Sequence, residues 1–249
     1  MRTYGLIGYP LGHSFSRQFF TRKFEQEGKA EQYLNFEINP VDQIIPIIHE
    51  HPELVGLNVT IPYKTKIIPF IDVLDETSGA IGAVNTIKIE RPEPGQILLK
   101  GFNTDVFGFM NSLLPLLKPH HNHALVLGTG GASRAVIHAL DLLGIRYLVV
   151  SRKLIPGETI SYADLDRDLM NTYTLIINTT PLGTFPDTAT YPDIPFDDLS
   201  DRHLLYDLVY NPPETRFMQL GLTRQATVKN GYDMLELQAL KSYEIWNTD

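Results

Sequence analysis

Cysteine is absent from the 249-residue sequence. This absence excludes disulfides, a thiolate nucleophile and metal sites built on thiolates. Long apolar runs are also lacking, and none approaches the ~18 residues that a membrane-spanning helix needs. The first ten residues, MRTYGLIGYP, contain no apolar core of a signal peptide and instead have the pattern of a strand. We therefore expect a cytoplasmic protein.

Positive charge is in deficit. Lys and Arg number 21 against 29 Asp and Glu, which gives a formal net charge of −8. Such a balance argues against a nucleic-acid-binding surface. An anionic ligand would have to be held by local cations, backbone N–H groups or hydroxyls rather than by the overall field. The length suits one large or two medium domains.

A strand, a glycine turn and a helix follow one another in the stretch ALVLGTGGAS. Residues 124–127 are apolar, three glycines follow within Gly128–Gly131, and residues 132–143 have helical apolar spacing up to Gly144. The start of such a helix offers unpaired N–H groups and a partial positive charge to a pyrophosphate. A tight connection without a ligand is the alternative, but the strand–turn–helix context favours a dinucleotide site.

The next predicted strand, 146–151, bears on the choice of cofactor. An acidic residue usually stands roughly 20 positions after the glycines and binds the ribose hydroxyls of NAD. Here that place holds Ser151, Arg152 and Lys153. A guanidinium can pair with a 2′-phosphate, whereas a carboxylate would repel it. The sequence therefore favours NADP, the alternative being that these cations are only solvated loop charges.

Alternating polarity marks a second informative stretch, GLNVTIPYK. Leu57, Val59 and Ile61 share one predicted strand face, which leaves Asn58 and Thr60 together on the other. Such a pair, with Lys64 just beyond the strand, could hold a polyhydroxylated ligand. The alternative is an edge strand with a solvated face. Asn85, among small residues in GAVNT, could likewise offer its amide to a ligand hydroxyl.

Several other polar residues have an ordinary structural explanation beside a functional one. Ser14 and Ser16 flank a predicted helix start, where hydroxyls act as caps. Asp105 opens another predicted helix, and Asp233 is expected to cap the last one. Gln238 lies near the apolar stripe of that helix and could contact a ligand or mark its boundary. The histidines of PHHNH, 119–123, lack an acidic partner nearby, so we expect no metal site.

Predicted strands alternate with helices through the second half of the chain, at 124–127, 146–151, 175–180, 204–209 and 226–228. This alternation is typical of an α/β fold with a doubly wound parallel sheet. Ligands bind such sheets at the carboxyl ends of the strands. The turns at 179–183 and 209–211 occupy that position.

Eight motifs in order resemble the shikimate dehydrogenase (shikimate/quinate dehydrogenase) family. They cover nearly the whole chain and comprise GHSFS (12–16), NVTIPYK (58–64), GAVNT (82–86), GFNTD (101–105), GTGGASRA (128–135), NTTPLG (178–183), YDLVYNPPET (206–215) and GYDMLELQA (231–239). The resemblance implies an N-terminal open α/β substrate domain, 1–103, completed by a C-terminal helix, 231–249. It also implies a Rossmann-type doubly wound parallel-sheet cofactor domain, 104–230.

The resemblance further implies a reaction, the reversible NADPH-dependent reduction of 3-dehydroshikimate to shikimate. Lys64 and Asp105 would be the acid–base pair, and Ser14 and Ser16 would hold the substrate carboxylate. The residues implied around the substrate ring are Asn58, Thr60, Asn85, Tyr210 and Gln238. Those implied for NADP are Gly128, Thr129, Gly130, Gly131, Ala132, Ser151, Arg152, Lys153, Thr179, Leu208 and Gly231.

The sequence departs from the family pattern after Lys153, where no clear second arginine follows. A quinate or dual-specificity dehydrogenase using NAD is therefore an alternative. A second alternative is a non-catalytic ligand sensor, which we would expect to lack Lys64 or Asp105 or to carry a DNA-binding extension. We expect a monomer or a homodimer with small-molecule ligands, and neither nucleic-acid nor membrane partners.

Overall fold

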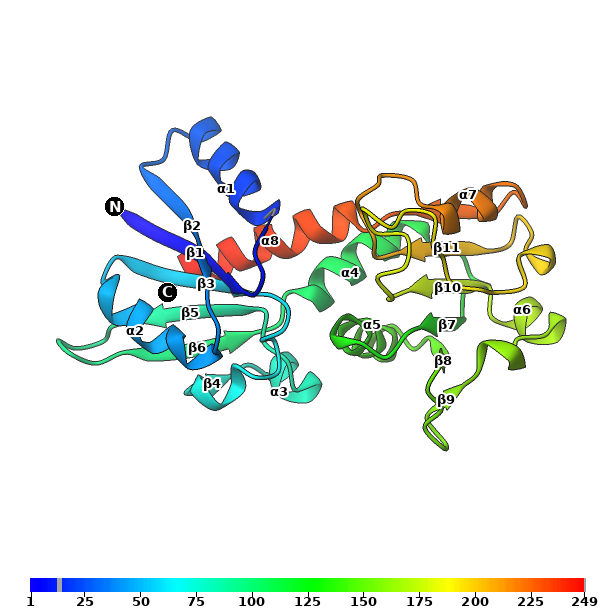
Figure 1. Ribbon diagram of the computed structural model, residues 1–249, viewed down its shortest axis with the longest axis horizontal. Coiled ribbons are helices and arrows are strands. Elements are labelled where there is room, and N and C mark those ends of the chain that lie inside the picture. Colours follow the sequence, from blue (N-terminus) through cyan, green and yellow to red (C-terminus); the bar gives the residue numbers. More distant parts are fainter. Residues whose placement is uncertain (13–14, 249) are drawn as a thin grey trace. The chain divides into compact units, whose positions relative to one another are not determined.

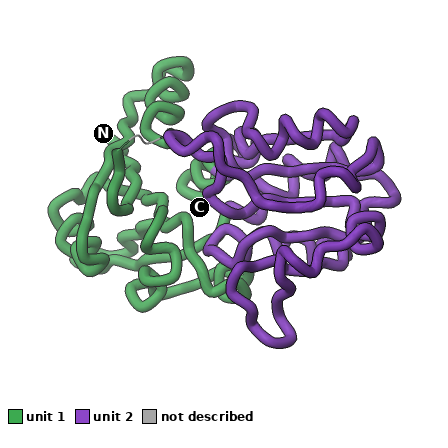
Figure 2. The backbone as a smooth tube through the Cα atoms, turned by 45° about the vertical axis from the view of Figure 1, so that its right-hand side comes forward, with its two compact units in different colours: residues 1–104, 239–249 green, residues 105–238 purple. Residues whose placement is uncertain are grey.

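The computed structural model describes residues 1–12 and 15–248, and the chain divides into two compact units. Unit 1 consists of residues 1–104 with 239–249, and unit 2 of residues 105–238 (Figure 2). The sequence places the return to the first domain at residue 231. In the structure the division falls inside the last helix, α8 (Tyr232–Asn247), between Gln238 and Ala239.

A mixed six-stranded sheet forms the centre of unit 1 (Figure 1). Its order is β2-β1-β3-β5-β6-β4, with bounds Glu31–Glu37, Arg2–Gly8, Leu54–Val59, Thr86–Glu90, Leu98–Phe102 and Val73–Leu74. Strand β3 pairs in parallel with β1 and antiparallel with β5. The edge-strand alternative for the stretch around Asn58 is therefore wrong, because β3 is central and Asn58 is buried.

Alternation along the strands of unit 1 separates two apolar clusters. Ile7, Leu57 and Val59 belong to an aliphatic cluster that includes residues of α2 (Ile44–Glu50). The third helix of this unit, α3 (Glu76–Ile81), follows β4 in the chain. Tyr4 and Leu6 belong to an aromatic cluster with α1 (Phe15–Gln26) and the C-terminal part of α8. The rings of the aromatic cluster are Tyr4, Phe20, Phe24, Tyr33 and Trp246.

Trp246 attaches α8 to the sheet of unit 1. Its ring lies 5.0 Å from that of Tyr4, and its indole N–H donates to the carbonyl of Ile87 at 2.9 Å. A Cβ on Gly56 would come within 2.3 Å of the indole, so only glycine allows this approach. The helix therefore docks where β3 carries no side chain.

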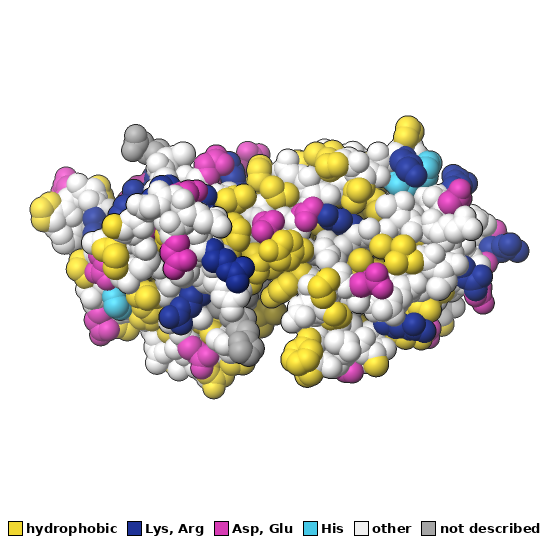
Figure 3. Space-filling model, turned by 90° about the horizontal axis from the view of Figure 1, so that it is seen from above, with side chains coloured by type: hydrophobic (Ala, Val, Ile, Leu, Met, Phe, Trp, Pro, Cys, Tyr) yellow, Lys and Arg dark blue, Asp and Glu magenta, His cyan; other side chains and the backbone are white. Residues whose placement is uncertain are grey.

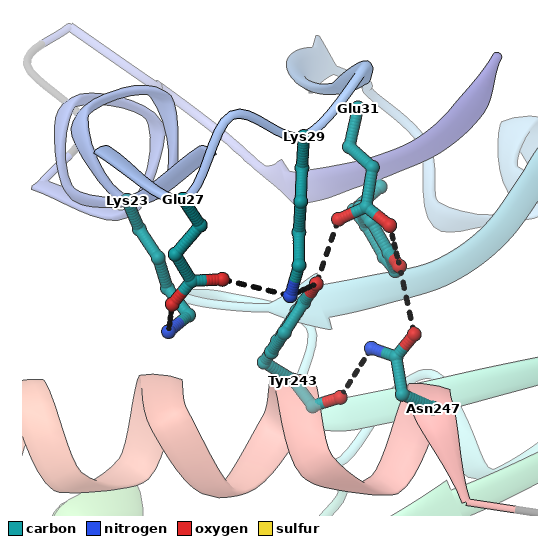
Figure 4. Close-up of polar contacts among 7 residues, drawn as sticks. Lys23, Glu27, Lys29, Glu31, Tyr243 and Asn247 are labelled. Carbon is teal, nitrogen blue, oxygen red and sulfur yellow. Dashed lines mark hydrogen bonds and ion pairs between the residues drawn. The ribbon is translucent and has the colours of Figure 1, made fainter. Parts of the chain in front are cut away.

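Polar contacts add to this attachment at the surface (Figure 4). Lys29 donates to the Tyr243 hydroxyl at 2.8 Å, and Tyr243 donates to Glu31 at 2.7 Å. Lys29 also pairs with Glu27. These contacts join the end of α1 and the start of β2 to α8. Each contributes modestly, because solvent screens exposed pairs.

An all-parallel sheet forms the centre of unit 2. Its order is β12-β11-β10-β7-β8-β9, with bounds Thr227–Lys229, Leu204–Asp207, Leu175–Asn178, His123–Leu127, Arg146–Val150 and Thr159–Ile160. From β7 the chain builds outward to β8 and β9, then returns to β10 on the other side. The order thus reverses at β7 and β10, the point where doubly wound sheets bind ligands. This confirms the α/β fold with a doubly wound parallel sheet.

Two of the helices of unit 2 begin within one residue of the starts predicted at Asp105 and Ala132. The helices of this unit are α4 (Asp105–Leu113), α5 (Gly131–Leu142), α6 (Arg167–Thr172) and α7 (Arg216–Leu222), together with the first part of α8. The cap expected at Asp233 is wrong, because α8 already begins at Tyr232. The Tyr232 N–H donates to the side chain of Asn230, and Asp233 pairs instead with Lys229.

Among the described residues, no helix combines the length and apolarity that crossing a bilayer requires. On the face shown in Figure 3, Lys and Arg side chains are interspersed with Asp and Glu.

Candidate functional site

Asn58 lies at the centre of a buried polar network in unit 1. Its carbonyl oxygen accepts from the Tyr33 hydroxyl at 2.7 Å, and its amide donates to the Ser242 hydroxyl at 2.9 Å. A longer contact of 3.3 Å reaches Thr86. Since buried amides are costly when unpaired, these partners fix the orientation of Asn58.

Asn85 extends the same network. Its carbonyl oxygen accepts from the Thr104 backbone N–H at 2.7 Å, and its amide donates to the Thr104 hydroxyl at 3.0 Å. Thr86 and Ser242 are 2.7 Å apart through their hydroxyls, and Ser242 is also 3.2 Å from Thr104. Sequence reasoning identified Asn58 and Asn85 but missed Thr86, Thr104 and Ser242.

Ser16 joins this network through Tyr33. It is the second residue of α1, and its hydroxyl hydrogen-bonds that of Tyr33. Burial raises the pKa of the Tyr33 phenol well above its ordinary value, so the hydroxyl stays protonated and can donate to Asn58. Ser14, its expected companion on the substrate carboxylate, lies outside the described residues.

Thr60 and Lys64 lie just beyond the end of β3. The Thr60 N–H donates to the Ile7 carbonyl at 3.0 Å, which keeps this turn beside the end of β1. The Lys64 carbonyl accepts from the Val84 N–H at 2.7 Å, so Lys64 is tied next to Asn85. The structure thus brings Asn58, Thr60, Lys64 and Asn85 to one region of unit 1.

The glycine turn of unit 2 has the form that a pyrophosphate site requires. Gly128 adopts a φ of 111°, and a Cβ there would lie 2.9 Å from the Thr179 hydroxyl. Gly130 is the N-cap of α5 and has no side-chain hydrogen bond capping the helix. An added Cβ at Gly130 or Gly131 would meet nothing within 4 Å. The backbone N–H groups at this helix start are therefore accessible to an anionic ligand.

Two cations follow the second strand of this unit. Ser151 is buried, and its hydroxyl accepts from the Lys153 N–H at 3.2 Å, which shapes the turn after β8. Arg152 and Lys153 are exposed. The carboxylate that usually binds the ribose hydroxyls of NAD is replaced here by these residues, which fit a 2′-phosphate better than a free 2′-hydroxyl.

Asp207 organises the turns at the carboxyl ends of β10 and β11. Its carboxylate accepts from the Thr215 hydroxyl at 2.6 Å, from the Asn178 amide at 2.9 Å and from the Val209 N–H at 3.0 Å. Asn178 in turn accepts from the N–H and the hydroxyl of Thr180. Sequence reasoning missed Asp207 and Asn178, although each is a polar residue that ends an apolar strand.

The residues expected near the nicotinamide lie on these turns. The Thr179 hydroxyl donates to the Leu127 carbonyl at 2.8 Å, which places it directly against Gly128. A Cβ on Gly231 would lie 2.1 Å from the Leu208 carbonyl oxygen, so these two backbone segments touch. In unit 2, most of the expected cofactor residues therefore lie together at the carboxyl ends of the strands.

Three remaining candidates also belong to unit 2. Asp105 is the first residue of α4 and is buried, and Tyr210 follows β11 with 39% of its surface exposed. Gln238 is buried, and its amide donates to the carbonyl of Leu235 in its own helix at 2.8 Å. The polar residues expected around one substrate are thus divided between the two units.

The histidines of segment 119–123 make structural contacts. One ring nitrogen of His120 and one of His121 each lie 3.0 Å from the Arg202 carbonyl. Burial lowers the pKa of His121. Within residues 1–12 and 15–248, no group of three His, Asp or Glu side chains is arranged to hold a metal ion.

Comparison with known proteins gives consistent matches along the whole chain. A family model described as the shikimate dehydrogenase substrate binding domain matches residues 6–87. A protein of Shouchella clausii named shikimate dehydrogenase (NADP(+)) is 36% identical, over 98% of this chain and 92% of its own.

Two solved structures are also similar. One is a shikimate 5-dehydrogenase from Thermus thermophilus in complex with NADP(H) and shikimate. It is 28% identical with a TM-score of 0.83, over 99% of this chain and 94% of its own. The other, from Listeria monocytogenes, contains shikimate and NAD. It is 25% identical with a TM-score of 0.87, over 99% of this chain and 91% of its own.

The Asp207 carboxyl makes stability depend on pH. Burial raises its pKa to about 6 from the ordinary 3.8. Between these values the folded chain binds more protons than the unfolded one, so this group's contribution to stability falls as pH rises from about 4 to about 6. We expect wild type to lose up to ~3 kcal/mol relative to Asp207→Asn between pH 4 and pH 7.

Urea unfolding of both proteins at the two pH values, followed by circular dichroism, measures this difference. The subtraction cancels every other titrating group. Parallel changes in the two proteins would show that Asp207 does not titrate in this range.

Proposed function

Because the chain belongs to the shikimate dehydrogenase family, we propose that it catalyses the reversible NADPH-dependent reduction of 3-dehydroshikimate to shikimate, a reaction of aromatic amino acid biosynthesis. The observation that carries the proposal is the glycine turn of unit 2. It leaves the start of α5 without a side-chain cap, at the reversal point of a parallel sheet and one strand from Arg152 and Lys153. This is the arrangement that binds a phosphorylated dinucleotide.

NADPH would supply the hydride to the substrate ketone, and the protein would supply orientation and one proton. Lys64, as an ammonium, would donate that proton to the oxygen that becomes the new hydroxyl. In the reverse direction its amine would accept the proton. Asp105 would hold the lysine in position by sharing the same proton network. Its burial and its place at the start of α4 support a fixed orientation.

Unit 1 would bind much of the substrate. Ser14 and Ser16 would donate to the carboxylate. The residues around the ring and its hydroxyls would be Asn58, Thr60 and Asn85 of unit 1, with Tyr210 and Gln238 of unit 2. The buried network supports this assignment for Ser16, Asn58 and Asn85, because it fixes their polar groups before any ligand arrives.

We place the enzyme in the cytoplasm, as a monomer or a homodimer, with small molecules as its ligands. NAD is a second candidate cofactor, because only Arg152 and Lys153 follow β8 and one similar structure contains NAD.

The reaction itself is tested with purified protein by nicotinamide absorbance. We expect rapid reduction of NADP by shikimate, with much slower reactions for NAD or for quinate, since Arg152 would favour the 2′-phosphate. A preference for NAD or quinate would replace the proposed specificity. A protein that reduces neither cofactor with either substrate would contradict the proposed activity.

Removing the Lys64 ammonium should abolish most turnover. Lys64→Ala is expected to lower kcat by roughly 10²–10⁴-fold with little change in shikimate affinity, because proton transfer is lost and binding is not. Lys66→Ala, which removes an exposed lysine two residues away, is the matched control and should behave as wild type. A large loss of affinity with normal kcat would instead make Lys64 a binding residue.

Tyr33 should act on substrate binding through its hydroxyl. Tyr33→Phe keeps the ring stacked on Phe20 but removes the hydrogen bonds to Ser16 and Asn58. Freed Ser16 and Asn58 side chains should raise KM for shikimate by roughly fivefold, with a smaller change in kcat, since one hydrogen bond contributes about 1 kcal/mol.

Tyr4→Phe is the control for this variant. Tyr4 belongs to the same aromatic cluster, and its hydroxyl makes only long contacts of 3.3 and 3.4 Å. Steady-state kinetics on both variants separates a loss of general stability from a loss of positioning. Equal KM values for Tyr33→Phe and wild type would argue against the role.

A further inference from the structure

Ser242 is a polar residue on the apolar stripe by which α8 packs against the rest of unit 1. Ala239 and Trp246 lie on the same side of the helix, one turn before and one turn after it, and each of the three residues is at most 2% exposed. An alanine at position 242 would have the higher helix propensity and would bury no polar group. The serine can therefore contribute at this position only through the hydrogen bonds of its hydroxyl.

The Ser242 hydroxyl contacts three segments of unit 1. It accepts from the side-chain amide of Asn58 at 2.9 Å, and it lies 2.7 Å from the hydroxyl of Thr86 and 3.2 Å from that of Thr104. Asn58 belongs to β3 and Thr86 to β5, while Thr104 stands between β6 and α4. Since all four side chains are buried, these hydrogen bonds replace those that water would otherwise make.

The same contacts continue from Ser242 to Asn85. The Asn85 carbonyl oxygen accepts from the Thr86 hydroxyl at 3.1 Å, and its amide donates to the Thr104 hydroxyl at 3.0 Å. Ser242 is therefore bonded directly to one of the two asparagines and through a threonine to the other. Asn58 also reaches Thr86 directly, but at the longer distance of 3.3 Å. The bonds through Ser242 are thus the shorter link between the two asparagines.

Orientation matters for both of these side chains. Each ends in a carbonyl oxygen that accepts and an amide group that donates, and a half turn exchanges the two. A polyhydroxylated ligand needs the matching partner for each hydroxyl, so a turned amide leaves a hydroxyl facing the wrong group. Groups that fix the amides therefore act on the affinity for such a ligand without touching it.

We propose that Ser242 is a positioning residue that holds the side-chain amides of Asn58 and Asn85 in the orientation in which they meet the ring hydroxyls of the substrate. The inference rests on the proposed function for the identity of that substrate. Ser242 acts through Asn58 and the two threonines and does not contact the ligand itself. The last helix of the chain thus contributes to substrate affinity through a buried hydroxyl, in addition to the packing of Trp246.

Removing the hydroxyl tests this role. Ser242→Ala should raise KM for shikimate about fivefold, with a smaller change in kcat and none in KM for NADP, because a hydrogen bond to a substrate-binding amide is lost. Ser242→Cys keeps the size of the side chain but forms weaker hydrogen bonds, so its KM should lie between those of Ser242→Ala and wild type. A KM for Ser242→Ala equal to that of wild type would overturn the inference.

Ser78→Ala is the matched control. Ser78 is also a fully buried serine on a helix of unit 1, and its hydroxyl donates to the Gly101 carbonyl at 3.0 Å. Urea unfolding should show a similar loss of stability in the two alanine variants, but only Ser242→Ala should change KM for shikimate. An equal rise of KM in Ser78→Ala would reduce the effect to a general loss of stability and would contradict the inference.

A double variant tests whether Ser242 acts through Asn58. Tyr33 and Ser242 hold this asparagine from its two ends, the carbonyl oxygen and the amide group. Because both would fix the same side chain, removing the second partner should add less than removing the first. The rise of KM in Tyr33→Phe combined with Ser242→Ala should therefore be smaller than the product of the two single effects. A rise equal to that product would show independent contributions and would contradict the inference.

NMR spectra of protein with isotope-labelled asparagine test the inference without a ligand. Ser242→Ala should shift or broaden the side-chain amide signals of both Asn58 and Asn85, whereas Ser78→Ala should leave them in place. Unchanged Asn85 signals in Ser242→Ala would overturn the inference and leave the proposed reaction intact. Shifted signals in a protein that reduces neither cofactor with shikimate would support the positioning role and overturn the proposed reaction.

Discussion

A buried side-chain amide must find its hydrogen bonds inside the protein, and in unit 1 this requirement falls on Asn58. Its partners Tyr33, Thr86 and Ser242 come from β2, β5 and α8, so one amide joins segments up to 184 positions apart. The same bonds hold the end of β3 in register beside Asn85. The turn that carries Lys64 therefore begins at a fixed position, and the proposed substrate-binding side chains beside it are held in place as well.

Unit 2 uses a carboxylate for the equivalent purpose. Asp207 is fully buried and joins the end of β10 to the turn after β11 through Asn178 and Thr215. Burial disfavours the charged form of this carboxyl group and so raises its pKa. Its hydrogen bonds in turn order two turns next to the start of α5. Asp207 thus orders turns without being a proposed ligand contact, whereas Asn58 both orders unit 1 and is proposed to bind the substrate.

The elements that the sequence predicted well are those with a strong local signal. The strand, glycine turn and helix through α5 were confirmed because apolar period, Gly128 and Gly144 all point the same way. Asn58 was ambiguous, since alternation cannot tell a central strand from an edge. Ser242 and Tyr33 were missed because their partners are distant in sequence.

Unit 1 is built from two segments that are separated in the chain by the whole of unit 2, which has a consequence for its synthesis. Tyr4, Phe20 and Phe24 of the aromatic cluster leave the ribosome before unit 2 does, yet Trp246, which completes the cluster, follows unit 2. At about 5–20 residues per second, residues 105–238 take roughly 7–27 s to make. Over that interval the aromatic side chains of unit 1 lack Trp246, whereas every strand of unit 2 lies within one continuous segment. Of the two units, the one whose synthesis begins first is thus the one that is completed last.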